Sequence, residues 1–140
     1  MPAALIVALV CTVILLVITA YFLMGSVPLM ILKHDTPLDA RFVRGFFNTY
    51  YVAASYAAGA TSLSYAVAGK LVFATGAAGL AVLTVLLRRS IMQRMDALRV
   101  ELQRNAAGAI EAFRRTHVAA ILANLAQLAI IVWSLVALPL

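Results

Sequence analysis

The chain has 140 residues, of which 65% are hydrophobic and 11% are charged, and its net charge is +6. Soluble globular domains carry roughly 25% charged residues, so this composition excludes an ordinary soluble domain and indicates an integral membrane protein. The basic residues are not interleaved with aromatic ones as a nucleic-acid surface requires, so we expect no nucleic-acid partner. Because no linker-like or low-complexity stretch interrupts the chain, residues 1–140 are predicted to form a single domain.

Four stretches are apolar over nearly the length that a helix needs to cross the membrane, which is about 20 residues. They cover approximately residues 4–27, 45–66, 71–87 and 117–138. The first has no basic residue ahead of it and lacks the short apolar core of a cleaved signal peptide, so we expect a retained helix. The predicted fold class is therefore all-α, an integral membrane four-helix bundle.

The positive charges fall almost entirely in the first and third connections. Of the eleven Lys and Arg residues, only Lys70 lies in the second connection. Basic connections are retained on the cytoplasmic side of a membrane. We therefore expect a multi-pass protein of the inner (plasma) membrane, with both termini outside the cell.

The first connection contains signals for the end of one helix and the start of the next. Pro28 removes a backbone donor and predicts that the first helix ends or kinks there. Thr36, Pro37 and Asp39 follow the pattern of a helix N-cap, a first helical proline and an acid three residues after the cap, so the second helix should start at Pro37. His34 then falls in the short link between the two helices.

The third connection, residues 88–116, is predicted to be a cytoplasmic hairpin in which the third and fourth helices extend beyond the membrane and are joined by a turn at residues 105–108 that ends in Gly108. Its apolar residues recur at spacings of four, three and four, which places one seam on a helix face: Ile91, Met95, Leu98 and Leu102. Three partners could cover this seam: the returning arm, the membrane surface or another protein. We expect contact with anionic lipid headgroups, a partner membrane subunit or a second copy through Arg88, Arg89, Arg94, Leu98, Leu102, Arg114 and Arg115.

The predicted spans contain no ionisable core residue, which argues against exporters that use an embedded carboxylate. The second and fourth helices instead carry matching polar stripes. These stripes, with the small residues at 76–79, can be contacts that hold the helices together. Alternatively they line a pocket for a quinone-like molecule, with these candidate residues: Asn48, Tyr51, Ser55, His117, Asn124 and Gln127.

His117 is the candidate residue with the most versatile chemistry, because a histidine titrates near neutral pH and can bind metal or haem. Our main expectation is an interfacial histidine that bonds headgroups or a neighbouring backbone, and the alternatives are a role in a ligand pocket or as a metal or haem ligand. His34 and Asp35 should lie on the same side of the membrane as His117. Since the spacing typical of metal ligands is absent, we expect no metal and no cofactor.

The run Phe113-Arg114-Arg115-Thr116-His117, followed by Asn124, resembles the last helix of small four-helix bacterial membrane proteins. This family is mostly of unknown function and is distantly related to anthrone-oxygenase-like proteins. The resemblance covers the C-terminal segment alone. It implies the four-helix plan, and oxygenase chemistry on polyketide aromatics would depend on His117 and Asn124.

Two functional hypotheses follow from these patterns. The first is a non-catalytic accessory or oligomeric membrane subunit that binds a protein partner or lipid through its basic hairpin and its helix faces. The second is a membrane oxidoreductase or a binder of a lipophilic, quinone-like ligand, with the polar stripe as its site. We favour the first, and so we expect a protein that is not an enzyme.

Overall fold

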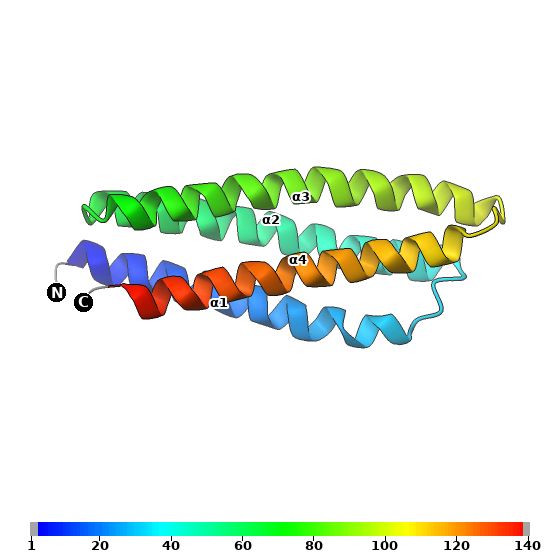
Figure 1. The fold of residues 1–140 in the computed structure, drawn as a ribbon, viewed down its shortest axis with the longest axis horizontal. Coiled ribbons are helices and arrows are strands. Elements are labelled where there is room, and N and C mark those ends of the chain that lie inside the picture. Colours follow the sequence, from blue (N-terminus) through cyan, green and yellow to red (C-terminus); the bar gives the residue numbers. More distant parts are fainter. Residues whose placement is uncertain (1–2, 139–140) are drawn as a thin grey trace.

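The computed structural model describes residues 3–138, and these residues form a bundle of long helices (Figure 1). The helices are α1 (Ala3–Ser26), α2 (Pro37–Val67), α3 (Leu71–Gln103) and α4 (Ala109–Ala137), and a short 3-10 helix, η1 (Pro28–Ile31), follows α1. The long helices run side by side along the long axis of the molecule. The all-α prediction is confirmed for the described part of the chain.

The two ends of the bundle differ in what they contain. The start of α1, the α2–α3 turn and the end of α4 lie at one end, whereas the α3–α4 turn and the link from η1 to α2 lie at the other (Figure 1). We call the second end the arginine-rich end and define it as residues 28–47 and 88–116. It contains all the Lys and Arg residues except Lys70.

Helix boundaries at the first connection agree with the sequence signals. The backbone N–H of Asp39 donates a hydrogen bond of 3.2 Å to Thr36 Oγ1, and Pro37 occupies the first helical position of α2. A proline costs nothing there because the N–H it lacks has no partner inside a helix. At the other side of the link, α1 ends at Ser26 and η1 starts at Pro28, which confirms the predicted end of the first helix.

Two glycines allow the chain to reverse direction at the hairpin turns. Gly69 has a φ of 72° before α3, and Gly108 has a φ of 76° before α4. This left-handed region is accessible to glycine and strained for most other residues. The predicted turn at residues 105–108 is confirmed, since α3 ends at Gln103 and α4 begins at Ala109.

Three of the described helices are long and apolar enough to cross a membrane: α1 together with η1, α3 and α4. With 33 residues, α3 is about 50 Å long at 1.5 Å per residue, well beyond a hydrocarbon core of about 30 Å. By contrast, α2 is not among the three apolar helices, although a crossing at residues 45–66 was predicted. Polar side chains lower its hydropathy, and its crossing stays a prediction.

Although it is the least apolar span, α2 packs extensively on both α1 and α3 and makes little contact with α4. Its inward face carries large aromatic side chains that are at most 1% exposed, namely Phe47, Tyr50 and Tyr51. At Gly25 of α1, an added Cβ would lie 2.7 Å from the ring of Phe46, so this glycine allows α1 and α2 to approach closely. The polar and aromatic residues of α2 are therefore mostly turned toward other helices.

The apolar seam of α3 is covered within the chain. Its four residues belong to one buried cluster with side chains from the first turns of α2 and α4. Because α2 begins at Pro37, a third helix packs beside the two that were predicted to form a hairpin. Leu98 and Leu102 are each 7% exposed, so they do not present the surface to a lipid or a partner that we expected.

Candidate functional site

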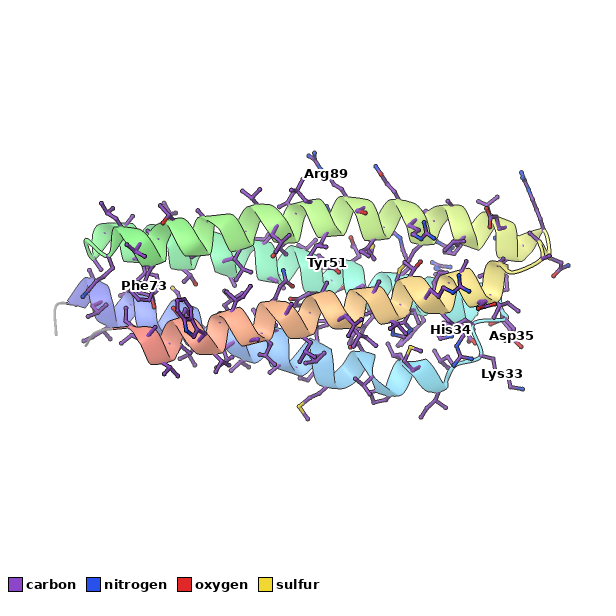
Figure 2. All side chains as sticks on the ribbon, in the orientation of Figure 1. Lys33, His34, Asp35, Tyr51, Phe73 and Arg89 are labelled. Atoms are coloured by element: carbon purple, nitrogen blue, oxygen red, sulfur yellow. The ribbon has the colours of Figure 1, made fainter. Side chains whose placement is uncertain are left out.

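Two buried histidines meet at the arginine-rich end. His34 lies in the link before α2, His117 lies on α4, and neither side chain is exposed. His34 Nε2 is 3.0 Å from His117 Nδ1, and the ring centroids are 5.2 Å apart in an edge-to-face arrangement. Figure 2 shows His34 within this end of the bundle, whereas Asp35 and Lys33 point away from it. The two histidines therefore lie together at one end of the bundle, which agrees with the expectation that they share one side of the membrane.

The second ring nitrogen of His117 contacts a backbone carbonyl that the local fold leaves free. His117 Nε2 is 3.1 Å from the carbonyl oxygen of Ser26. In a continuous α-helix this oxygen would accept from the N–H of Met30. Pro28 breaks the helix, and the N–H of Met30 donates instead to the carbonyl oxygen of Val27 at 3.0 Å. The 3-10 turn therefore provides the acceptor for His117.

These contacts determine which ring nitrogens carry protons. A carbonyl oxygen only accepts, so the N–H of His117 must be at Nε2, and its Nδ1 is then the acceptor in the neutral ring. His34 must therefore donate from Nε2 to His117 Nδ1. This leaves His34 Nδ1 as a buried nitrogen without a hydrogen-bond partner among the described residues.

Burial lowers the pKa of His34 below its ordinary value of 6.5, and the positive charge of Arg114 lowers this pKa further. Three weaker effects act in the opposite direction, from the carboxylates of Asp39 and Asp35 and from the carbonyl of Leu32. The lowered pKa agrees with the neutral tautomer that the hydrogen bonds require. The pair is therefore uncharged, and its hydrogen bonds join the link to α4 and, through Ser26, to the end of α1.

Aromatic rings shield the pair from its surroundings. The ring of Phe47 lies edge-on to His117 with centroids 5.3 Å apart, and the centroid of Phe113 is 5.7 Å from that of His34. The prediction that His117 bonds lipid headgroups is therefore wrong, because its side chain is fully buried. The alternative that it bonds a neighbouring backbone is confirmed by its contact with Ser26.

A second group of buried polar side chains connects three helices nearer the middle of the bundle. The hydroxyl of Tyr50 on α2 donates to Gln127 Oε1 on α4 at 2.6 Å, and Gln127 Nε2 donates to Thr84 Oγ1 on α3 at 2.9 Å. Sequence reasoning singled out Gln127 but missed Tyr50 and Thr84. The available signal was the presence of hydroxyl groups inside otherwise apolar spans, where they need hydrogen-bond partners.

The other candidate pocket residues do not share one environment. Asn48 Oδ1 accepts from Arg88 Nε at 3.0 Å, and the Ser55 hydroxyl donates to the carbonyl of Tyr51 within α2. By contrast, the hydroxyl of Tyr51 and both polar amide atoms of Asn124 are buried with no hydrogen-bond partner in the part of the chain that the structure describes. The predicted stripe is therefore divided between pairs that join the helices and two side chains whose polar atoms remain unpaired.

Several arginines of the arginine-rich end contact other helices of the same chain. Arg44 of α2 donates two hydrogen bonds, of 2.9 and 3.0 Å, to the carboxylate of Asp96 on α3. Arg94 Nε donates to the hydroxyl of Thr116 on α4 at 3.1 Å. These arginines join helices at the end of the bundle, so their side chains are already engaged.

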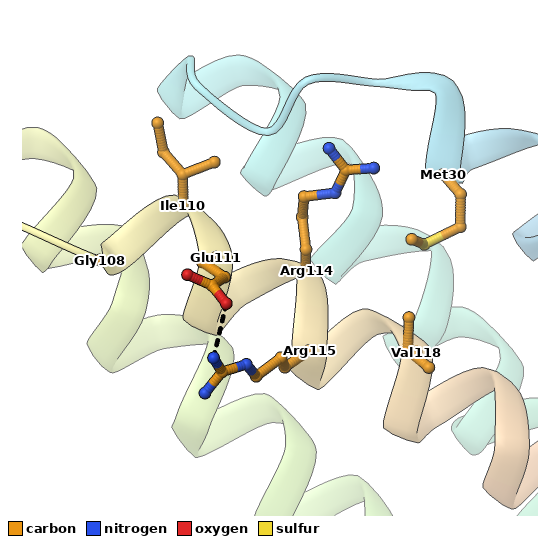
Figure 3. A pocket seen from close by; sticks show the side chains of 7 residues that line it. All are labelled: Met30, Gly108, Ile110, Glu111, Arg114, Arg115 and Val118. Carbon is orange, nitrogen blue, oxygen red and sulfur yellow. Dashed lines mark hydrogen bonds and ion pairs between the residues drawn. The ribbon is translucent and has the colours of Figure 1, made fainter.

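Arg114 and Arg115 instead line an open groove of about 680 Å³ between η1 and the start of α4 (Figure 3). Arg114 extends toward the link between η1 and α2, whereas Arg115 forms an ion pair with Glu111. Met30 and Val118 form an apolar part of the groove. Among residues 3–138, no carboxylate lies within ion-pair distance of Arg114.

The structure brings together only part of the candidate metal set. His34 and His117 are in contact, but Asp35 is exposed and faces away. Within the described residues, no three or more His, Cys, Asp or Glu side chains gather closely enough to hold a metal ion. The two histidines are best described as a hydrogen-bonded pair.

Comparison with known proteins finds no family, no curated protein and no solved structure that matches this chain. The functional argument therefore depends on the geometry of the chain itself.

Proposed function

We propose that this chain is a non-catalytic protein of the inner membrane that crosses the bilayer four times and binds anionic lipid headgroups at its arginine-rich end. Its three long apolar helices support a membrane location. The packing of α2 along α1 and α3 supports a crossing by α2 as well. Because basic segments are retained in the cytoplasm, the arginine-rich end is assigned to the inner side and both termini to the outer side.

The main support for the proposed lipid binding is the groove beside η1. It combines the guanidinium group of Arg114, which has no carboxylate partner among residues 3–138, with the apolar side chains of Met30 and Val118. A lipid headgroup needs this combination, since its phosphate attracts a cation while its glycerol and upper chain prefer apolar contacts. Arg115 contributes less, because Glu111 already pairs with it.

The test compares binding of phosphatidylglycerol and phosphatidylcholine to the detergent-solubilised protein, for example by native mass spectrometry. Arg114→Gln should weaken phosphatidylglycerol binding by about ten-fold, since one charge-assisted contact contributes roughly 1.5–3 kcal/mol. Arg89→Gln is the matched control: it removes the same charge from an outward-facing position on α3, away from the groove (Figure 2). Equal affinity for both lipids, or an equal loss in both variants, would contradict the proposal.

The proposal does not include a partner subunit, because the seam that suggested one is buried inside the chain. It also leaves out the oxidoreductase hypothesis. Four of the six side chains expected to hold a quinone-like ligand form hydrogen bonds within the bundle instead, namely Asn48, Ser55, His117 and Gln127.

A further inference from the structure

A pocket of about 140 Å³ lies toward the end of the bundle that is opposite the arginine-rich end. All four helices contribute to its wall, including Thr12 of α1, Tyr65 of α2, Phe73 and Gly76 of α3, and Trp133 of α4. Figure 2 places Phe73 at this end of the molecule, far from His34. The pocket is therefore separate from the groove that contains Arg114.

The hydroxyl groups on the wall are engaged within the bundle. Thr12 Oγ1 is 2.7 Å from the carbonyl oxygen of Ala8 and 3.0 Å from the Tyr65 hydroxyl. Thr61 and Ser134 each donate to a carbonyl of their own helix. The rest of the wall is apolar, so an occupant would gain its binding energy by burying hydrocarbon, with no need of hydrogen bonds.

Small residues of α3 create the space. An added Cβ at Gly76 would meet no atom within 4 Å, and the same is true at Gly79. The expectation that the run 76–79 brings helices into close contact is therefore wrong at both glycines. At Gly76, which lines the pocket, the missing side chain leaves room for another molecule.

The residues around the opening are exposed and apolar. Val72 is 80% exposed and Trp133 is 70% exposed, on two helices that are long and apolar enough to cross a membrane. The material next to such an opening is lipid hydrocarbon. We propose that the pocket holds the end of the hydrocarbon tail of a membrane lipid, inserted between α3 and α4.

This proposal requires α3 and α4 to lie in the membrane, and it is independent of headgroup binding at Arg114. A neutral lipid therefore tests it without involving the proposed function. The chain has one tryptophan, Trp133, which lies at the pocket. Bromine atoms quench tryptophan fluorescence at short range. Phosphatidylcholine with a dibrominated acyl chain can therefore be titrated into the protein in detergent micelles while the fluorescence of Trp133 is measured.

We expect quenching of Trp133 that saturates at low lipid in the wild type and in the control variant Gly79→Leu. This control places a leucine on α3 three residues from Gly76 and outside the pocket wall. Gly76→Leu fills the pocket and should weaken the saturable quenching by about ten-fold, equivalent to roughly two lost buried methylene groups. Gly76→Ala should fall between the wild type and Gly76→Leu. Because its Cβ meets open space and alanine favours helix, this variant should remain folded.

Quenching that rises linearly in all four proteins would overturn the proposal, since it would report bulk lipid only. A second copy of the chain in the pocket would also overturn it. That occupant would appear by light scattering as a wild-type dimer that Gly76→Leu converts to a monomer, with lipid quenching unchanged.

Discussion

His34 has a backbone φ of 60°, in the left-handed region that residues with a side chain adopt infrequently. Such strain persists only where surrounding contacts hold the residue in place. Here the contacts are the hydrogen bond to His117 and the packing of the ring beside Phe113. The link is therefore held at the bundle by His34 together with Leu32, which packs against the main apolar cluster, and the favourable energy of these contacts must exceed the cost of the His34 backbone conformation.

The first prediction concerns the pH dependence of stability. The pKa of His34 is below 6.5 in the folded protein and near 6.5 when the chain is unfolded. Below about pH 6.5 the unfolded state therefore binds a proton that the folded state does not. The free energy of unfolding should fall as the pH is lowered from 7 to 5, which thermal unfolding in micelles can measure.

The control for this prediction is His34→Asn, because asparagine tolerates a positive φ but does not titrate. The variant should lose less stability than the wild type between pH 7 and pH 5. A wild-type stability that rises on acidification would contradict the assignment of His34 as a buried neutral base.

The sequence allowed the two histidines to be placed on the same side of the membrane, and their direct contact agrees with that. It did not allow the contact with the Ser26 carbonyl to be predicted. That acceptor is free only because the chain after Pro28 forms a 3-10 turn, in which Met30 donates to Val27 instead. A pattern of residue types does not specify such a local change of hydrogen-bond partner.

At the scale of helices, two kinds of contact join the first turns of α2 to residues 88–103 of α3. Met95 is fully buried in the apolar cluster. The neighbouring Asp96 accepts two hydrogen bonds from Arg44, but the side chains of this pair are 46% and 31% exposed. Solvent weakens a partly exposed ion pair, so the apolar contact should dominate.

The second prediction compares these two adjacent residues. Met95→Ala should lower the free energy of unfolding by about 2–5 kcal/mol, because it leaves a cavity in a packed region. Asp96→Asn should lower it by about 1 kcal/mol or less. Unfolding of the two variants in detergent decides between the contacts, and an equal or larger effect of Asp96→Asn would show that the ion pair holds this end together.

The bounds of the helices could be predicted well, because Pro28, Thr36 and Gly108 are local signals that act within one turn of the chain. The cover of the α3 seam could be predicted only in part: the returning arm was one of the three candidates and supplies Ala109 and Phe113, but the first turns of α2 were not among them. The early start of α2 was expected at Pro37, but which face of α2 meets α3 depends on the rotation of both helices. The sequence therefore left three partners open for Leu98 and Leu102, and the structure uses segments of the same chain.

At the scale of the molecule, charge is distributed along the bundle axis. Cations gather at the arginine-rich end, and Lys70 lies at the α2–α3 turn at the other end. The membrane prefers this arrangement in one orientation, with the basic end in the cytoplasm. The proposed orientation can be tested because Cys11 is the one cysteine of the chain, so single-cysteine variants need only one replacement first.

The third prediction is the outcome of that labelling experiment. In a Cys11→Ala background, Ala68→Cys should react with a membrane-impermeant maleimide in intact cells, whereas Ala107→Cys should react only after the cells are opened. Ala68 lies in the turn between α2 and α3, and Ala107 lies in the turn between α3 and α4. Labelling of Ala107→Cys in intact cells would contradict the orientation, and labelling of both variants in intact cells would contradict the single crossing by α3 between them.

If the chain crosses the bilayer four times, as we propose, the modest hydropathy of α2 has a consequence for biogenesis. A helix released alone from the insertion machinery meets lipid on every side, and α2 would then expose Tyr50, Tyr51 and Tyr65 to hydrocarbon. In the finished protein α1 contacts Tyr50 and Tyr65, while the ring of Phe73 on α3 packs beside Tyr65. We therefore expect ribosome-bound chains that end shortly after Val67 to be held at the translocon, and release to follow once α3 has emerged.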